Sequence, residues 1–149
     1  MEKGMPILLV EDDVVDIKTI QKALNENNIC NPLYVTGNGE EALRFLRSEG
    51  EYSEPGKSPR PGIILLDLNM PVMGGLEFLE QIKNNGNLKR IPVIVLTTSK
   101  EDSDMVKSYD LSVAGYVIKP VDFDKFLEVV KVINLYWELC ELAPRDNRY

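Results

Sequence analysis

Histidine is absent from this chain of 149 residues, and its absence excludes several kinds of active site. Without an imidazole the chain cannot build a Ser-His-Asp triad, a histidine general base or a zinc site with histidine ligands. Any chemistry must therefore come from carboxylates, hydroxyls and lysines.

Cysteine and long apolar runs are also scarce. The two cysteines, Cys30 and Cys140, are far apart and show no CxxC spacing, so we expect reduced thiols rather than a disulfide or a metal site. No apolar run approaches the roughly 18 residues of a membrane span, and the N-terminus lacks the pattern of a signal peptide. We therefore expect a soluble cytoplasmic protein with no membrane partner.

Basic residues are outnumbered by acidic ones. The chain has 17 lysines and arginines against 24 aspartates and glutamates, which gives a formal net charge of −7. Such a charge opposes sequence-independent binding to a phosphate backbone or to an anionic membrane. Nucleic acid is not expected as a direct partner.

Short β-type runs alternate with helix-type segments along the chain. The segments between the runs carry apolar residues at intervals of three and four, and a final long helix is expected over about residues 122–142. The β-type runs cover residues 6–10, 32–36, 63–67, 92–97 and 115–118. This alternation predicts the α/β class, with a doubly wound, five-stranded parallel sheet and helices on both faces. Ligands of such folds bind beyond the carboxyl ends of the strands.

One stretch interrupts this pattern. Residues 48–62 are rich in proline, glycine, serine and charge, which is typical of a surface loop. Its composition leaves two interpretations open, a tolerated insertion or a loop that contacts a partner.

Acidic side chains follow two of the predicted strands. Glu11, Asp12 and Asp13 follow the first strand, and Asp67 ends the third. At one edge of a parallel sheet these acids would repel one another without a cation, and Mg²⁺ suits the site better than Ca²⁺. We expect Asp12 and Asp67 to bind Mg²⁺ and Glu11 to hold a metal-bound water. For the three acids after the first strand, capping of the first helix is the alternative.

Hydroxyl groups and a lysine follow the fourth and fifth strands. Thr97, Thr98 and Ser99 end the fourth run, and Lys119 follows the fifth. Together with Asp67 they fit phosphoryl transfer to a carboxylate, in which Asp67 attacks phosphorus and forms an acyl phosphate. Lys119 would pair with the phosphoryl group, and Thr97 would donate its hydroxyl to the product.

The strand-end motifs together resemble the receiver domain of two-component response regulators. The motifs are "VEDD" at 10–13, "LLDLNMPVMGG" at 65–75, "VIVLTTS" at 93–99 and "GYVIKP" at 115–120. The resemblance covers nearly the whole chain and implies a CheY-like fold with strand order 2-1-3-4-5. It also implies phosphorylation of Asp67 by a partner histidine kinase, which supplies the missing histidine, and the backbone carbonyl of Asn69 as a further ligand of Mg²⁺.

The same resemblance implies a conformational switch. Thr97 matches the conserved hydroxyl residue of the family and Tyr116 its aromatic switch, so phosphorylation would draw Thr97 inward and let Tyr116 turn into the vacated space. Alternatively, Tyr116 is a half-buried strand aromatic. Thr98 stands where the family commonly has a small residue and would narrow access to the phosphoryl group. Ser99 and Asp13 are the other residues expected to modulate the site.

Output is expected to come from protein binding. About 30 residues follow Lys119, enough for the final helix and a short tail, so we expect a single receiver domain over residues 1–149 with no output domain. The final helix carries a wide apolar arc, which suits either a homodimer or a longer cover of its own sheet. Its tryptophan and the loop at 48–62 also resemble the single-domain response regulators of phytochrome-type kinases, such as those of cyanobacteria.

Three other functions share parts of this pattern. A haloacid-dehalogenase-type phosphatase would need an aspartate two residues after Asp67, where the chain has Asn69. A flavodoxin-type FMN carrier needs a phosphate-binding loop after the first strand, where the three acids would repel phosphate. A scaffold that works without phosphorylation would not need the complete set of site residues. We therefore predict a signalling domain rather than an enzyme, with only self-catalysed phosphorylation and slow autodephosphorylation.

Overall fold

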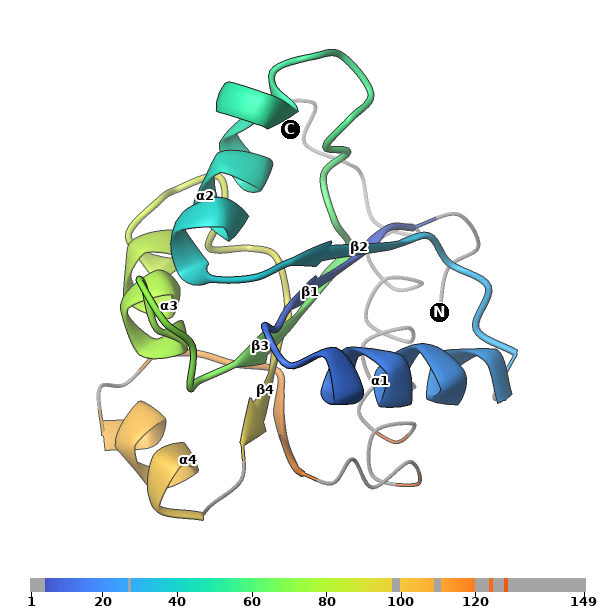
Figure 1. The fold of residues 1–149 in the computed structure, drawn as a ribbon. Coiled ribbons are helices and arrows are strands. Elements are labelled where there is room, and N and C mark those ends of the chain that lie inside the picture. The colour runs from blue at the N-terminus through green and yellow to red at the C-terminus, as the bar shows by residue number, and fades with distance from the viewer. Residues whose placement is uncertain are drawn as a thin grey trace, which may run out of the picture.

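The computed structural model describes residues 5–26, 28–97, 100–108 and 111–119, together with Asp124 and Glu128 (Figure 1). Except for Asp124 and Glu128, the predicted final helix over about 122–142 lies outside the described residues. Thr98 and Ser99 lie outside them as well.

The described residues form one parallel sheet of five strands in the order β2-β1-β3-β4-β5. The strands are β1 (Ile7–Val10), β2 (Leu33–Thr36), β3 (Ile63–Asp67), β4 (Val93–Thr97) and β5 (Gly115–Ile118). The predicted fold class and strand order are confirmed.

Prolines explain the small difference between the predicted and observed strand bounds. The runs predicted to begin at Pro6, Pro32 and Pro92 each form a strand that begins one residue later. Proline has no N–H to donate to the strand ladder, so it stands outside the paired segment. Its carbonyl still takes part: Pro32 accepts a hydrogen bond from the N–H of Ile7 at 2.8 Å, and Pro92 accepts one from Ile64 at 2.9 Å.

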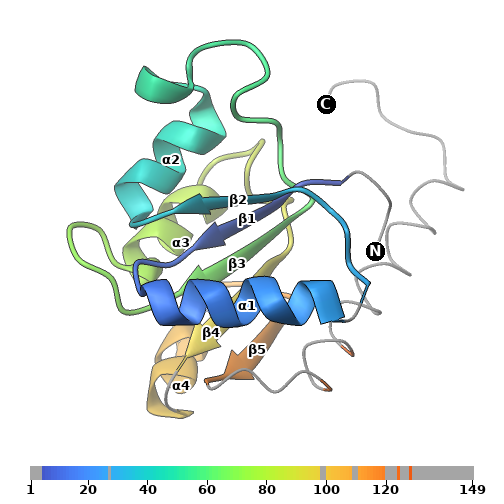
Figure 2. The same cartoon turned by 45° about the vertical axis from the view of Figure 1, so that its right-hand side comes forward.

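Alternate residues of the central strands supply two separate cores. Leu8 and Ile64 belong to the core beneath helices α2 (Gly39–Arg47), α3 (Gly75–Lys83) and α4 (Lys100–Ser108). Ile7 and Ile63 face the opposite way, toward α1 (Val14–Glu26). Figure 2 shows α1 crossing one face of the sheet while α2, α3 and α4 cover the other. Burial on both faces accounts for the continuous apolar runs of β1 and β3.

The loop at 48–62 is a surface segment, as predicted, and it is attached to α2. Tyr52 ends a short 3₁₀ turn (Gly50–Tyr52) and places its ring 5.2 Å from that of Phe45, centroid to centroid. The Tyr52 hydroxyl donates a hydrogen bond of 2.8 Å to Glu41 Oε1. These contacts fix the start of the loop on the fold and are compatible with both interpretations of its role.

No helix within the described ranges is both long enough and apolar enough to cross a membrane.

Candidate functional site

Two buried carboxylates lie where β1 and β3 end. Val10 pairs in register with Leu66, so the residues that follow them, Glu11 and Asp67, leave the sheet at the same edge. Glu11 is 1% exposed and Asp67 is 4% exposed, because each continues directly from a strand that is buried on both faces. The predicted juxtaposition of the two acids follows from the parallel register.

Asp12 completes a cluster of three acids with Glu11 and Asp67. One carboxylate oxygen from each residue lies within 4.8 Å of the others. Asp12 is exposed, so the cluster opens to solvent on its side. Carboxylate oxygens at this spacing match the ligands that a hard divalent cation prefers. The three residues therefore fit a divalent metal ion of this kind.

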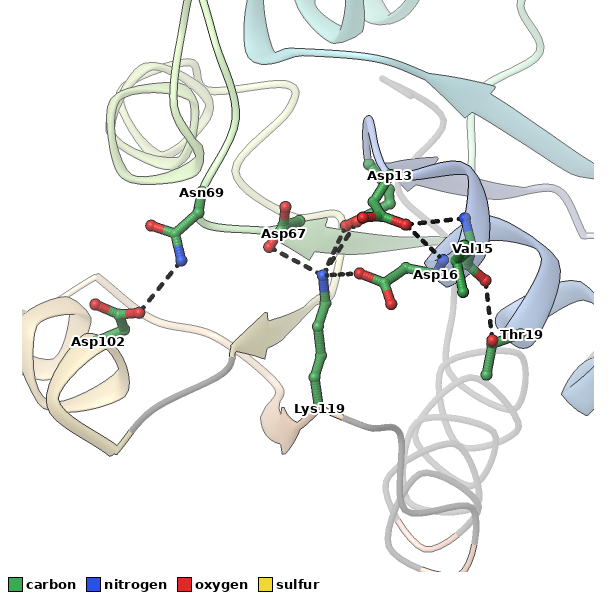
Figure 3. Close-up of polar contacts among 9 residues, drawn as sticks. Asp13, Val15, Asp16, Thr19, Asp67, Asn69, Asp102 and Lys119 are labelled. Atoms are coloured by element: carbon green, nitrogen blue, oxygen red, sulfur yellow. Dashed lines mark hydrogen bonds and ion pairs between the residues drawn. The ribbon is translucent and has the colours of Figure 1, made fainter.

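Lys119 lies beside the two buried acids, and the phosphoryl-binding role predicted for it stays a prediction. Its Nζ atom is 3.1 Å from both carboxylate oxygens of Glu11 and 3.3 Å from Asp67 Oδ1. It is also 2.8 Å from Asp16 Oδ2, which is the shortest of these contacts (Figure 3). The Lys119 side chain is only 10% exposed, and its ammonium group forms ion pairs with all three carboxylates.

This arrangement shifts the pKa values of the groups in it. Burial raises the pKa of Glu11 from 4.5 to about 8, against the opposing effect of its hydrogen bonds from Lys119. Burial alone would lower the pKa of Lys119, but its hydrogen bonds to Asp16 and Glu11 and the charge of Asp67 raise it overall. The hydrogen bond from Lys119 lowers the pKa of Asp16. Glu11 therefore binds its proton more tightly than an ordinary glutamate does, while the contact with Lys119 favours the charged form of Asp16.

Asp13 is the N-cap of α1. Its Oδ1 accepts hydrogen bonds from the N–H groups of Val15 at 2.8 Å and Asp16 at 3.0 Å (Figure 3). Capping, the alternative for all three acids after β1, therefore holds for Asp13, whereas Glu11 pairs with Lys119. The modulating role predicted for Asp13 stays a prediction.

The loop after β3 connects the phosphoacceptor candidate to two helices. Asn69 Nδ2 donates a hydrogen bond of 3.3 Å to Asp102 Oδ2 of α4 (Figure 3). The N–H of Gly75, the first residue of α3, donates to the carbonyl of Leu68 at 3.0 Å. A Cβ atom on Gly75 would collide with the Asp67 carbonyl oxygen and lie 2.7 Å from Leu68 Cα. Only glycine lets α3 begin this close to Asp67.

The two predicted switch residues are on neighbouring strands. Thr97 ends β4 and pairs in register with Ile118, the residue before Lys119. Tyr116 is half-buried on β5, and burial raises its pKa. Lys107 of α4 places its Nζ atom 4.9 Å from the centroid of the Tyr116 ring, a cation–π contact. The strand positions are as predicted, and the switching roles stay predictions.

Sequence reasoning missed Asp16, Asp102 and Lys107. Asp16 is an acid in the first turn of a helix, where the helix dipole already explains it. Asp102 and Lys107 are polar residues of α4 and carry no local motif. The only signal for Asp16 was its position three residues after Asp13, on the helix that follows the acidic cluster.

Known response regulators are similar to this chain in sequence and in fold. The response regulator Rcp1 of Synechocystis sp. is 43% identical over 131 residues, which cover 88% of this chain and 87% of Rcp1. The structure of the Mn²⁺-bound form of Rcp1 matches with a TM-score of 0.71 and 42% identity, and covers 89% of this chain and 94% of that one.

Two further solved structures are similar to this fold. The bacteriophytochrome response regulator RtBRR matches with a TM-score of 0.81 and 42% identity, over 87% of this chain and 77% of that one. The phosphorylated cyanobacterial phytochrome response regulator RcpA matches with a TM-score of 0.72 and 42% identity, over 90% of this chain and 94% of that one. Residues 7–131 match the family described as the response regulator receiver domain, so the chain belongs to the receiver domains of two-component response regulators.

Proposed function

We propose that this response regulator accepts a phosphoryl group on Asp67 from a partner histidine kinase and signals by changing a protein-binding face. The observation that carries the proposal is the position of Asp67. Its carboxylate ends a fully buried strand, lies 3.3 Å from Lys119 Nζ and shares a cluster with Glu11 and Asp12.

The proposed transfer is a displacement at phosphorus. An Asp67 carboxylate oxygen forms a bond to the phosphorus of a phosphohistidine, and the bond between phosphorus and the imidazole nitrogen breaks. The bonding electron pair stays on that nitrogen, and the imidazole leaves neutral because its other ring nitrogen carries a proton in the protonated phosphohistidine. The chain contains no histidine, so the donor imidazole belongs to the partner. Most of the catalytic effect in such a reaction comes from positioning and charge neutralisation.

This chain's own residues would supply both effects. Lys119 is already held beside Asp67 and would pair with the phosphoryl oxygens. Asp12 and Asp67, with the backbone carbonyl of Asn69 and a water on Glu11, would hold Mg²⁺, which neutralises charge on the transferring oxygens when bound. The Mn²⁺-bound form of Rcp1 supports a divalent ion at this site.

The proposed partners rest on the relatives. RtBRR is named a bacteriophytochrome response regulator and RcpA a phytochrome response regulator, which favours a phytochrome-type histidine kinase as the partner of this chain. A downstream protein and a homodimer remain part of the proposal, with Thr97 and Tyr116 as the switch. The single-domain organisation and the cytoplasmic location also stay predictions.

A small phosphodonor tests the proposal. Incubation with acetyl phosphate and Mg²⁺ should add the mass of one phosphoryl group to the intact protein, and the adduct should decay slowly once the donor is removed. Asp67→Asn should abolish the adduct, while Asp104→Asn, a matched change on the exposed surface of α4, should not. Omission of the divalent ion should prevent it as well.

The proposal fails if the wild type gains no phosphoryl group, or if the adduct survives in the Asp67→Asn variant. Multiple-turnover release of phosphate from the donor would instead indicate a phosphatase.

A further inference from the structure

Asp16 makes the shortest contact of the Lys119 ammonium group, yet it is outside the acidic cluster that fits a metal ion. The Asp16 Oδ2 to Lys119 Nζ distance is 2.8 Å, against 3.1 Å to Glu11 and 3.3 Å to Asp67. An ammonium group has three N–H donors, and Lys119 uses them for one hydrogen bond to Asp16 and two to Glu11, while Asp67 forms an ion pair with it. Asp16 is therefore a full partner of Lys119 rather than a distant surface charge.

The position of Asp16 is fixed by its own backbone. Asp16 belongs to the first turn of α1, and its N–H donates a hydrogen bond of 3.0 Å to the capping Asp13 Oδ1. The Asp16 side chain is 36% exposed, whereas those of Glu11 and Asp67 are 0% and 6% exposed. Asp16 thus contacts the ammonium group from the solvent side, and the two buried acids contact it from inside.

The three carboxylates differ in what a divalent cation would do to them. Glu11 and Asp67 belong to the cluster whose oxygens lie within 4.8 Å of one another, so an ion there would compete with Lys119 for both. Asp16 is not in that cluster, so an ion held by the cluster would not compete with Lys119 for the Asp16 carboxylate. The hydrogen bond from Lys119 also lowers the pKa of Asp16, which favours its charged form.

We propose that Asp16 is a positioning residue that holds the Lys119 ammonium group at the site when a divalent ion occupies the cluster of Glu11, Asp12 and Asp67. This inference rests on the proposed phosphorylation of Asp67, in which Lys119 neutralises the phosphoryl oxygens. A cation held in place beforehand loses less freedom as the phosphoryl group arrives. Loss of the Asp16 charge should therefore slow phosphorylation and release the lysine toward solvent.

Chemical labelling measures the release without any phosphorylation. Wild type and the isosteric Asp16→Asn variant are treated with acetic anhydride with and without Mg²⁺, and acetylation of Lys119 is followed by peptide mass mapping relative to exposed Lys57. We expect severalfold faster acetylation of Lys119 in Asp16→Asn, with the larger difference in the presence of Mg²⁺. Glu26→Gln removes one charge from the other end of α1 and should leave Lys119 labelling unchanged.

Phosphorylation by acetyl phosphate provides the second measurement. Asp16→Asn should react severalfold more slowly at saturating Mg²⁺, and Asp16→Glu, which keeps the charge, should recover part of the rate. Thermal unfolding of each variant shows whether the fold is intact. A general loss of stability would speed the acetylation of many lysines rather than of Lys119 alone.

Two results would overturn the inference: unchanged labelling of Lys119 in Asp16→Asn, or phosphorylation of that variant at the wild-type rate or faster. A faster rate would mean that Asp16 competes with the phosphoryl group for Lys119. If wild type itself is not phosphorylated, the proposed function fails, whereas the labelling experiment still decides whether Asp16 holds the lysine.

Discussion

Replacement of Gly75 by alanine tests how closely helix α3 constrains the phosphoacceptor. Gly75 begins α3, and its N–H donates to the Leu68 carbonyl at 3.0 Å. An added Cβ would collide with the carbonyl oxygen of Asp67 and lie 2.7 Å from Leu68 Cα. Both contacts are with backbone atoms, which cannot swing aside as the end of a flexible side chain can. The strand end and the helix start must therefore move apart.

The expected magnitude comes from two opposing effects. In an unhindered helical position, a change from glycine to alanine stabilises a protein by about 0.5–1 kcal/mol. Forcing a methyl group into a closely packed site costs about 1–3 kcal/mol, and backbone contacts belong at the upper end of that range. We therefore expect Gly75→Ala to lower the free energy of unfolding by about 1–2 kcal/mol. The displaced Asp67 should also be phosphorylated more slowly.

Gly86→Ala provides the matched control. Gly86 is exposed, and an added Cβ there would have no atom within 4 Å. That variant should be unchanged or more stable by about 0.4–1 kcal/mol, through the smaller entropy of its unfolded chain. Urea unfolding of both variants gives the comparison, and acetyl phosphate with Mg²⁺ gives the phosphorylation rates. Equal stability and equal phosphorylation rates for the two variants would refute the argument that only glycine fits at position 75, beside the Asp67 backbone.

Two further predictions concern residues near the same edge of the sheet. Val72 has a φ of 68° and is 77% exposed, so Val72→Asn should relieve left-handed strain, lose little burial and raise the free energy of unfolding by about 1 kcal/mol. Urea unfolding checks this, and a less stable variant would contradict it. Because the pKa of Glu11 is raised from 4.5 to about 8, the folded state binds more protons than the unfolded state within that window. The metal-free wild type should therefore lose stability as pH rises, by up to about 1.4 kcal/mol per pH unit relative to Glu11→Gln, and parallel pH profiles of the two proteins would count against the raised pKa.

The sequence by itself determined the sheet and the edge on which the site is built. Runs such as residues 63–67 are apolar throughout, which favours strands buried on both faces, and their alternation with helices leaves a parallel sheet as the natural arrangement. Once the strands are parallel, their carboxyl ends meet at one edge. Asp67 and Lys119 could therefore be placed together from the order of the motifs alone.

The tertiary structure decided which of the acids does what. Asp13 and Asp16 are both acids at the start of α1, and the helix dipole favours each of them there. Residue type alone therefore could not show that Asp13 caps the helix and that Asp16 binds Lys119. The distinction depends on how α1 lies across the sheet, since Asp16 and Lys119 are 103 positions apart in the chain.

The packing around the site was equally invisible to local patterns. Lys107 contacts Tyr116, and Tyr52 donates a hydrogen bond to Glu41, although no pattern in the segment of Lys107 or of Tyr52 indicates these partners. Periodicity reports which face of an element is buried, because burial recurs with the period of the element. It carries no information about which polar side chains of different elements contact one another, and those contacts set the charge, the burial and the pKa values of this site.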